Sequence, residues 1–268
     1  MSIQLTRGAT WFKQLTHNAP LIEGFCPSVQ VSDAAIGEQT ARFIAVVADE
    51  DNKFPRAKGG QVGILEGWNL AKAVTEAVKA DADKDVKRAI IAVIDVPSQA
   101  YGRREEGLGI HQSLAAAAGA YAKARLAGHP VIGLIVGKAM SGAFLAHGYQ
   151  ANRLIAIDDS YVEVHAMGKA SAARITLRSI ESLEKLASTI PPMAYDIKNY
   201  ASLGILDELV NVANADQPDE TAIATVLNSV VHQISQARAN GSSLANRLGA
   251  ENRKNSSTVR ELMRQQWA

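Results

Sequence analysis

Three short apolar runs, separated by segments with helical spacing, most constrain the fold of this chain. The runs span residues 40–47, 89–94 and 131–136 and contain few polar side chains. Strands of this kind are typical of parallel sheets that are buried on both faces. Between them, residues 65–80 place apolar side chains on one helical face, and residues 111–127 form an alanine-rich helix pattern that ends at Gly-His-Pro. This order predicts an α/β chain with crossover helices.

The rest of the chain adds shorter elements to this framework. Residues 153–157 are a predicted strand, and residues 221–238 carry the strongest helical pattern of the chain. Residues 1–39 have mixed character and are expected to form an arm without active chemistry. Within it, Trp11 and Phe12 are suited to cover part of a core or to dock against another subunit.

The composition excludes several classes of function. With 28 basic and 27 acidic residues the net charge is +1, so no overall field attracts nucleic acid or an anionic membrane, and neither is an expected partner. Cys26 is the single cysteine, which rules out an intrachain disulfide, and no paired His or Cys spacing predicts a metal site. The sequence shows no apolar run of membrane-spanning length and no secretory leader, so a cytoplasmic protein is expected.

The candidate functional stretch follows the third apolar run and reads Gly-Lys-Ala-Met-Ser-Gly-Ala. We expect the strand to turn at Gly137 and a helix to follow the small residues Ser141, Gly142 and Ala143. Small side chains let a ligand lie against the backbone, and the first amides of a helix lack acceptors within the helix, so they can donate to a developing anion. A tight packing turn explains the same residues equally well, and both interpretations stay open.

A second candidate loop, residues 95–107, follows the strand predicted at residues 89–94. Ligands of open parallel sheets bind beyond the carboxyl ends of the strands, so this loop and the stretch after the third run are expected to face one site. Tyr101, Arg103 and Arg104 are suited to contact an anionic substrate. A salt-bridged rim would use the same residues, and neither interpretation is favoured.

A basic loop after the first apolar run gives a weaker signal. Lys53, Arg56 and Lys58 precede a pair of glycines and carry the charge needed to hold phosphates. Because no Walker-type lysine follows the glycines, a surface loop is the favoured interpretation.

Two histidines are candidates for proton transfer. His111 begins a predicted helix, where the dipole disfavours an imidazolium, but a surface histidine is the simpler interpretation. Glu163 and His165 share one face of a strand predicted at residues 160–165. A satisfied structural pair is favoured over a proton relay because no third group is evident. No GxSxG elbow surrounds Ser141, so nucleophilic catalysis is disfavoured.

Two parts of the chain resemble a known superfamily. The string GKAMSGAFLAHGYQANRLIAIDDSYVEV resembles the G-x-x-x-SG[GA] turn of the carboxyltransferase branch of the crotonase superfamily, and DVPSQAYGRREE is similar to the D-x-P-G-type loop of that branch. The likeness spans residues 40–210. The strings RFIAVVADEDNKFPRAKGGQVGILEGW and IDVPSQAYGRREEGLGI resemble still more closely the γ subunits of biotin-independent malonate decarboxylases.

The resemblance implies a fold and a set of partners. It implies a crotonase-like ββα spiral with flanking helices over residues 40–240, between the arm of residues 1–39 and a tail of residues 241–268. It also implies a homologous β subunit that shares the active site, an acyl carrier protein subunit, and the transferase subunit of that carrier. No cofactor is expected on the chain itself, because the dephospho-CoA-type prosthetic group belongs to the acyl carrier protein.

The activity implied is loss of CO2 from a malonyl thioester on the carrier protein. Decarboxylation leaves an enolate, and main-chain amides at Gly142 and Ala143 suit its oxygen. The expected catalytic residues are Ser141, Gly142, Ala143, Tyr101, His111 and His165, of which the last three are proton-donor candidates in that order. The residues expected to contact substrate are Pro97, Ser98, Gly102, Arg103, Arg104, Gly137, Lys138 and Met140.

The chain departs from the acetyl-CoA carboxylase α subunits of this branch at three places. Ala143 replaces their second glycine, Ser98 replaces the glycine after the proline of the D-x-P loop, and residues 165–168 (His-Ala-Met-Gly) replace their S-P-E-G segment. These departures weigh against a biotin substrate. A biotin-dependent acyl-CoA carboxyltransferase subunit and a catalytically silent scaffold remain as alternatives.

Overall fold

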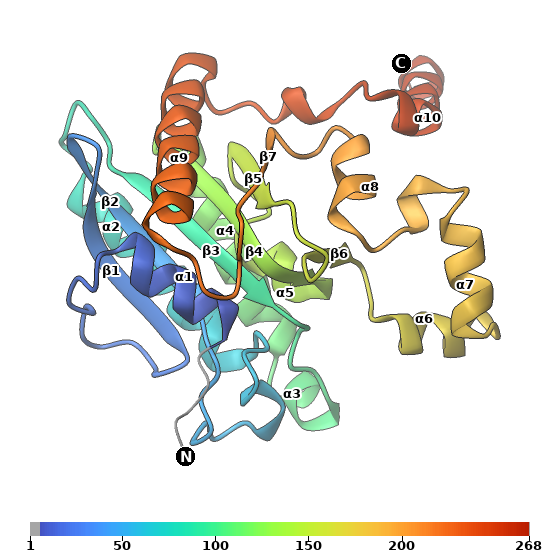
Figure 1. Ribbon diagram of the computed structural model, residues 1–268, viewed down its shortest axis with the longest axis horizontal. Coiled ribbons are helices and arrows are strands. Elements are labelled where there is room, and N and C mark those ends of the chain that lie inside the picture. Colours follow the sequence, from blue (N-terminus) through green and yellow to red (C-terminus); the bar gives the residue numbers. More distant parts are fainter. Residues whose placement is uncertain (1–5, 268) are drawn as a thin grey trace.

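The computed structural model describes residues 6–267, which form one seven-stranded sheet with helices on both faces (Figure 1). The sheet order is β1-β2-β3-β4-β5-β7, and β6 pairs with the end of β4. Only β1 and β2 are antiparallel among these strands. The strands are β1 (Val29–Ile36), β2 (Gln39–Val46), β3 (Ala89–Val96), β4 (Val131–Met140), β5 (Arg153–Ile157), β6 (Glu163–His165) and β7 (Glu208–Val210).

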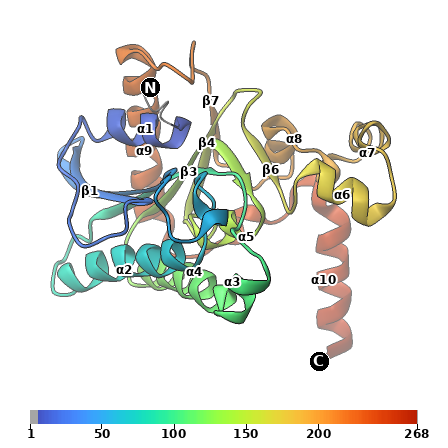
Figure 2. The same ribbon diagram turned by 90° about the horizontal axis from the view of Figure 1, so that it is seen from below.

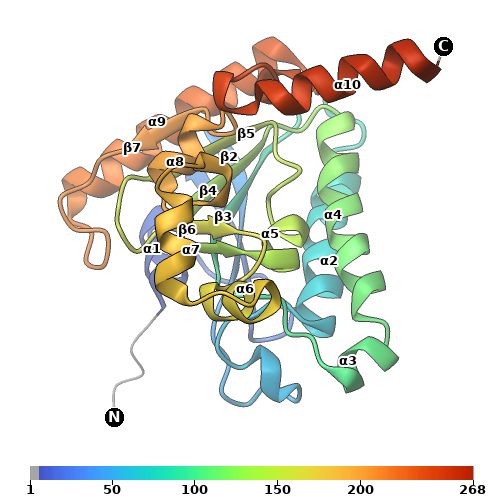
Figure 3. The same cartoon turned by 90° about the vertical axis from the view of Figure 1, so that its right-hand side faces the viewer.

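Helices cover the sheet in two layers. α2 and α4 pack on each other along one face, and α1 and α9 lie on the opposite face (Figure 2). α6, α7 and α8 lie to one side of β6, and α10 extends away from the sheet (Figure 3). Within residues 6–267, none of the helices has both the length and the apolar character to cross a membrane. The α-helices are α1 (Arg7–Leu15), α2 (Ile64–Ala80), α3 (Arg103–Gly107), α4 (Ile110–Leu126), α5 (Ser141–Ala146), α6 (Lys169–Thr176), α7 (Ile180–Ala187), α8 (Ile197–Ser202), α9 (Glu220–Asn240) and α10 (Lys254–Trp267).

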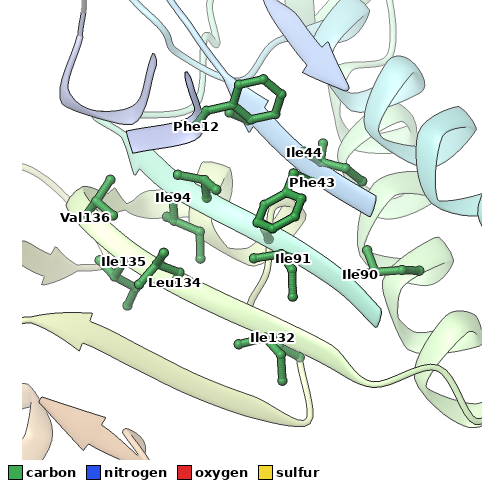
Figure 4. Close-up of a cluster of buried hydrophobic side chains, with 14 of the residues drawn as sticks. Phe12, Phe43, Ile44, Ile90, Ile91, Ile94, Ile132, Leu134, Ile135 and Val136 are labelled. Atoms are coloured by element: carbon green, nitrogen blue, oxygen red, sulfur yellow. The ribbon is translucent and has the colours of Figure 1, made fainter. Parts of the chain in front are cut away.

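The central strands form the core because they are apolar on both faces. Every residue of β3 is buried, and its isoleucines lie between side chains of β2 and β4 (Figure 4). The parallel register of these three strands confirms the prediction of a parallel sheet with crossover helices. β5, α2, α4 and α9 also lie where the sequence predicted them, apart from differences of a few residues at their ends.

The N-terminal region contributes to this core, and the expected arm of residues 1–39 contains a strand that the sequence did not predict. This strand, β1, precedes β2 and pairs with it along its whole length. Trp11 in α1 is fully buried, and its Nε1 donates to the carbonyl of Ala215 at 2.8 Å. Arg7 forms ion pairs with Asp159 and Asp216, both at 2.7 Å. The division of the chain at residues 39 and 240 stays a prediction.

The predicted turn at Gly137 is also wrong, because β4 continues to Met140. A Cβ on Gly137 would lie 2.1 Å from Oδ1 of Asp95, a buried carboxylate at the end of β3. The same oxygen accepts from the amide of Lys138 at 3.0 Å, and Oδ2 accepts from the amide of Gly8 at 2.9 Å. Glycine at position 137 therefore makes room for a carboxylate that ties α1 and β4 to the end of β3.

Candidate functional site

A cavity of about 490 Å³ lies where β4 gives way to α5. The loop after β3 contributes Gln99 to its wall, and α5 contributes Ser141, Gly142 and two apolar side chains. Tyr149 in the loop after α5 and the segments around β6 and α8 contribute the rest. Most of these side chains are apolar or aromatic. The volume is in the range of small-ligand sites, and such sites combine apolar walls with a few polar groups.

The backbone is strained at the point where the cavity meets α5. Ser141 has a φ of +62°, in the left-handed region that costs a residue with a side chain roughly 1–2 kcal/mol. Strained backbone of this kind concentrates at functional sites. The left-handed residue ends β4 and starts the six-residue helix α5, with Gly142 and Ala143 in its first turn.

Gly142 offers its amide to an oxygen at the cavity wall. Its N–H donates to Oε1 of Gln99 at 3.1 Å, and a Cβ on Gly142 would lie 2.0 Å from that oxygen. Glycine is therefore required for this contact. The sequence prediction missed Gln99, although it directly follows Ser98 in the D-x-P loop.

Three of the six predicted catalytic residues meet at the cavity: Ser141, Gly142 and His165. Ala143 is fully buried beside them. Tyr101 is 55% exposed, and His111 is exposed on α4. Neither is among the described residues that line the cavity. Catalytic roles for all six residues stay predictions.

His165 reaches the cavity because β6 pairs with the end of β4, with His165 opposite Met140. Its ring stacks on Tyr195, with ring centroids 3.9 Å apart, and its Nδ1 lies 3.0 Å from the carbonyl oxygen of Met167. Burial lowers the pKa of His165, so its ring is neutral at neutral pH.

Glu163 and His165 do not form the favoured structural pair. The Glu163 carboxylate accepts from Nζ of Lys138 at 2.8 Å and lies 3.8 Å from Nζ of Lys169. The two side chains therefore have separate partners. Lys138, one of the residues expected to contact substrate, is held by this ion pair and by the ring of Tyr161, 4.3 Å from its Nζ.

Apart from Gln99, the loop after β3 lies outside the described wall of the cavity. The short helix α3 replaces the loop expected at residues 103–107, and both Arg103 and Arg104 are exposed. A Cβ on Gly102 would lie 2.5 Å from Nε of Arg56, which belongs to the basic loop before α2.

The remaining predicted contact residues occupy varied positions. Pro97 is exposed, the hydroxyl of Ser98 donates to the carbonyl of Gln99 at 3.0 Å, and Met140 is 5% exposed. None of the residues expected to contact substrate is therefore among the described residues that line the cavity. Their contacts with substrate stay predictions. In the described part of the chain, no three His, Cys, Asp or Glu side chains are grouped closely enough to hold a metal ion.

Comparison with known proteins gives consistent matches. The family model described as malonate decarboxylase gamma subunit matches residues 57–267. A chain of a Pseudomonas malonate decarboxylase hetero-tetramer in complex with coenzyme A is 57% identical, with a TM-score of 0.94, and the match covers 98% of this chain and 100% of that one. A chain of a Pseudomonas malonate decarboxylase MdcD-MdcE hetero-dimer is 54% identical, with a TM-score of 0.90 over 98% and 99% of the two chains.

A curated relative is more distant. The Malonyl-S-ACP:biotin-protein carboxyltransferase MADD of Malonomonas rubra is 38% identical over 188 residues, which are 69% of this chain and 64% of that protein. The match thus spans less than two thirds of that relative. The expected crotonase-like fold of carboxyltransferases is confirmed by the structural likenesses. Because the family model covers most of the sequence, the chain belongs to the malonate decarboxylase gamma subunit family.

Proposed function

We propose that this chain pairs with a homologous β subunit and helps to decarboxylate a malonyl thioester carried by an acyl carrier protein. The observation that carries the proposal is the amide of Gly142, which donates to an oxygen at the wall of the apolar cavity. This contact supports the assignment of the Gly142 amide as the donor to an enolate oxygen. The hetero-tetramer and hetero-dimer reported for the similar Pseudomonas proteins support a β partner.

The chemistry requires a donor and a dry pocket. The bond between the carboxylate carbon and its neighbour breaks, CO2 leaves, and the electron pair moves into an enolate on the thioester oxygen, whose carbon then takes a proton. A preorganised donor at such an oxygen is worth on the order of a hundredfold in rate. Gly142 supplies one amide and Ala143 the next in the turn, while the buried ring of Phe144 helps to exclude water from the departing carboxylate.

The proposed carrier brings its substrate on a dephospho-CoA-type arm. The cavity volume of about 490 Å³ suits the thioester end of such an arm. We assign its phosphates to the exposed cations Lys53, Arg56 and Lys58 on the loop before α2. We assign protonation of the product to His165, because it lines the cavity; its neutral ring takes up a proton from solvent before it passes one to the product carbon. A transferase subunit that serves the carrier and a cytoplasmic location complete the proposal, from the same resemblance.

The first test is release of CO2 from malonyl thioester by the chain alone, by the chain with its β partner, and by that pair with avidin. We expect activity in the pair alone, indifferent to avidin. Activity in the isolated chain would contradict a shared site. Loss of activity with avidin would instead support a biotin-dependent reaction.

A bulky residue at Gly142 tests the chemical role of its amide. Gly142→Val in the assembled pair is expected to lower kcat by on the order of a hundredfold, because the side chain fills the space in front of the amide. Gly119→Val is the matched control, since a Cβ on Gly119 in α4 meets no atom within 4 Å. Undiminished turnover by an assembled Gly142→Val pair would favour the scaffold alternative, with the decisive groups in the partner.

One observation favours a second candidate, carboxyl transfer to biotin. The relative MADD is named as a malonyl-S-ACP:biotin-protein carboxyltransferase. The departures at Ser98 and Ala143 weigh against it for this chain. Transfer of labelled carboxyl from the malonyl thioester to biotin, measured in the assembled pair, separates the two reactions.

A further inference from the structure

We propose that the side-chain amide of Gln99 blocks the oxyanion position in the absence of substrate and rotates away when a thioester binds. The inference rests on the proposed function and concerns access to the same cavity. Its basis is the hydrogen bond from the amide of Gly142 to Oε1 of Gln99, at 3.1 Å, on the wall of the cavity. One N–H at one position serves one acceptor oxygen well, so the glutamine and a substrate oxygen compete for it.

The space around Gly142 makes this competition exclusive. A Cβ on Gly142 would lie 2.0 Å from Oε1 of Gln99 and 3.2 Å from its Cδ, and 3.6 Å from Cδ1 of Leu114. The carboxamide thus fills the volume directly beside the glycine, with Leu114 on another side. A thioester oxygen that reaches the amide must take the place of the glutamine oxygen.

Only the side chain of Gln99 has to move. Its backbone is held by a bridge to Val62, since the amide of Val62 donates to the carbonyl of Ser98 at 3.1 Å and the amide of Ala100 donates to the carbonyl of Val62 at 2.8 Å. The half-buried side chain is free to change rotamer about this fixed strand segment. When the Gln99 side chain rotates away, the amide of Gly142 donates to the thioester oxygen in place of the glutamine oxygen. The amide therefore has an acceptor both with and without substrate.

The exchange predicts a measurable effect on substrate binding. A neutral hydrogen bond of this kind, lost from the free enzyme, tightens the binding of its competitor by roughly 2- to 10-fold. Gln99→Met keeps the length of the side chain and removes the acceptor, so it should lower the KM of the assembled pair for malonyl thioester by that factor. Gln99→Glu keeps the shape and strengthens the acceptor with a charge, so it should raise KM.

The chain provides a control in Gln39, at the start of β2. Its Oε1 accepts from Nη2 of Arg238 at 2.8 Å, an exposed contact outside the described wall of the cavity and outside the loop of Lys53, Arg56 and Lys58. Gln39→Met should leave KM unchanged. An unchanged or raised KM for Gln99→Met, measured beside this control, would overturn the proposal.

A second measurement observes the contact without turnover. In the full chain labelled with 15N-glycine and assembled with its partner, the amide of Gly142 should exchange its proton with solvent faster in Gln99→Met than in the wild type. An unchanged exchange rate would overturn the proposal that Gln99 blocks the amide of Gly142, whatever the rate of CO2 release. Faster exchange combined with an unchanged KM would overturn it as well. If the wild-type pair releases no CO2, the proposed function fails, while exchange still decides whether Gln99 covers the amide.

Discussion

Acid should weaken this fold through one buried histidine. His147, just after α5, is fully buried, with Nδ1 3.0 Å from the hydroxyl of Tyr121 and Nε2 3.1 Å from the carbonyl oxygen of Val93. Only a protonated Nε2 can donate to that carbonyl, so the neutral ring accepts from Tyr121 at Nδ1. Burial, partly offset by the carbonyl of Val93, lowers the pKa of His147 to about 4.

The sign and size of the effect follow from linkage. Above the ordinary pKa of 6.5 the ring is neutral in both folded and unfolded chains, and its contribution to stability is complete. Below 6.5 the unfolded chain binds the proton first, so each pH unit down to about 4 removes about 1.4 kcal/mol from the free energy of unfolding. Over the whole window the loss is about 3 kcal/mol. Burial also lowers the pKa of His129 and His165, so comparison with a variant is needed.

Urea unfolding of the wild type, His147→Gln and Tyr121→Phe between about pH 7.5 and about pH 4.5 isolates this contribution. A glutamine has no titrating group, so the slope of its unfolding free energy against pH should be flatter than that of the wild type by about 1.4 kcal/mol per unit below pH 6.5. Tyr121→Phe should keep the wild-type slope, because burial is the main cause of the shift. Equal slopes for the wild type and His147→Gln would refute the reasoning.

Three further predictions concern stability. Gly137→Ala should lower the free energy of unfolding by about 1–3 kcal/mol, because its Cβ would collide with the carboxylate of Asp95. Gly119→Ala should instead raise the free energy of unfolding by up to about 1 kcal/mol, and denaturant titration of both variants distinguishes the two signs. Arg7→Ala should lower it by about 2–3 kcal/mol through loss of two ion pairs, seen as a reduced thermal midpoint. Lys254→Ala removes an exposed pair and should change stability by less than about 0.5 kcal/mol, and a larger loss would contradict this accounting.

The sheet could be predicted because its signal is local. The runs that became β2, β3 and β4 are apolar on both faces, and few other structures bury such strands. α1 and β1 were missed because their apolar side chains are scattered among turn-forming residues. Their positions depend on distant partners, as when Trp11 donates to the carbonyl of Ala215.

The site could be predicted only in part. The small residues after β4 indicated a segment that lines the cavity, since Gly142 lies on its wall. The turn was predicted four residues too early, because the glycine at position 137 makes room for the carboxylate of Asp95 and does not end the strand. A single glutamine in a loop forms no sequence pattern that would indicate a functional role. The role proposed for Gln99 depends on its contact with Gly142, which lies 43 residues later in the sequence. The sequence could not show that His165 is the one of the three proton-donor candidates that lines the cavity, because its position depends on the pairing of β6 with β4.

The anchoring of α1 has a consequence for the time course of synthesis. Its Arg7 finds Asp216 as a partner 209 residues later in the chain. At about 5–20 residues per second, a ribosome needs roughly 10–40 s to make that stretch. During this interval α1 can already pack on β2, β3 and β4, but the ion pair of Arg7 with Asp216 and the hydrogen bond of Trp11 to the carbonyl of Ala215 cannot form. The helix α1 is therefore fully anchored only long after it has been made, once Ala215 and Asp216 have followed.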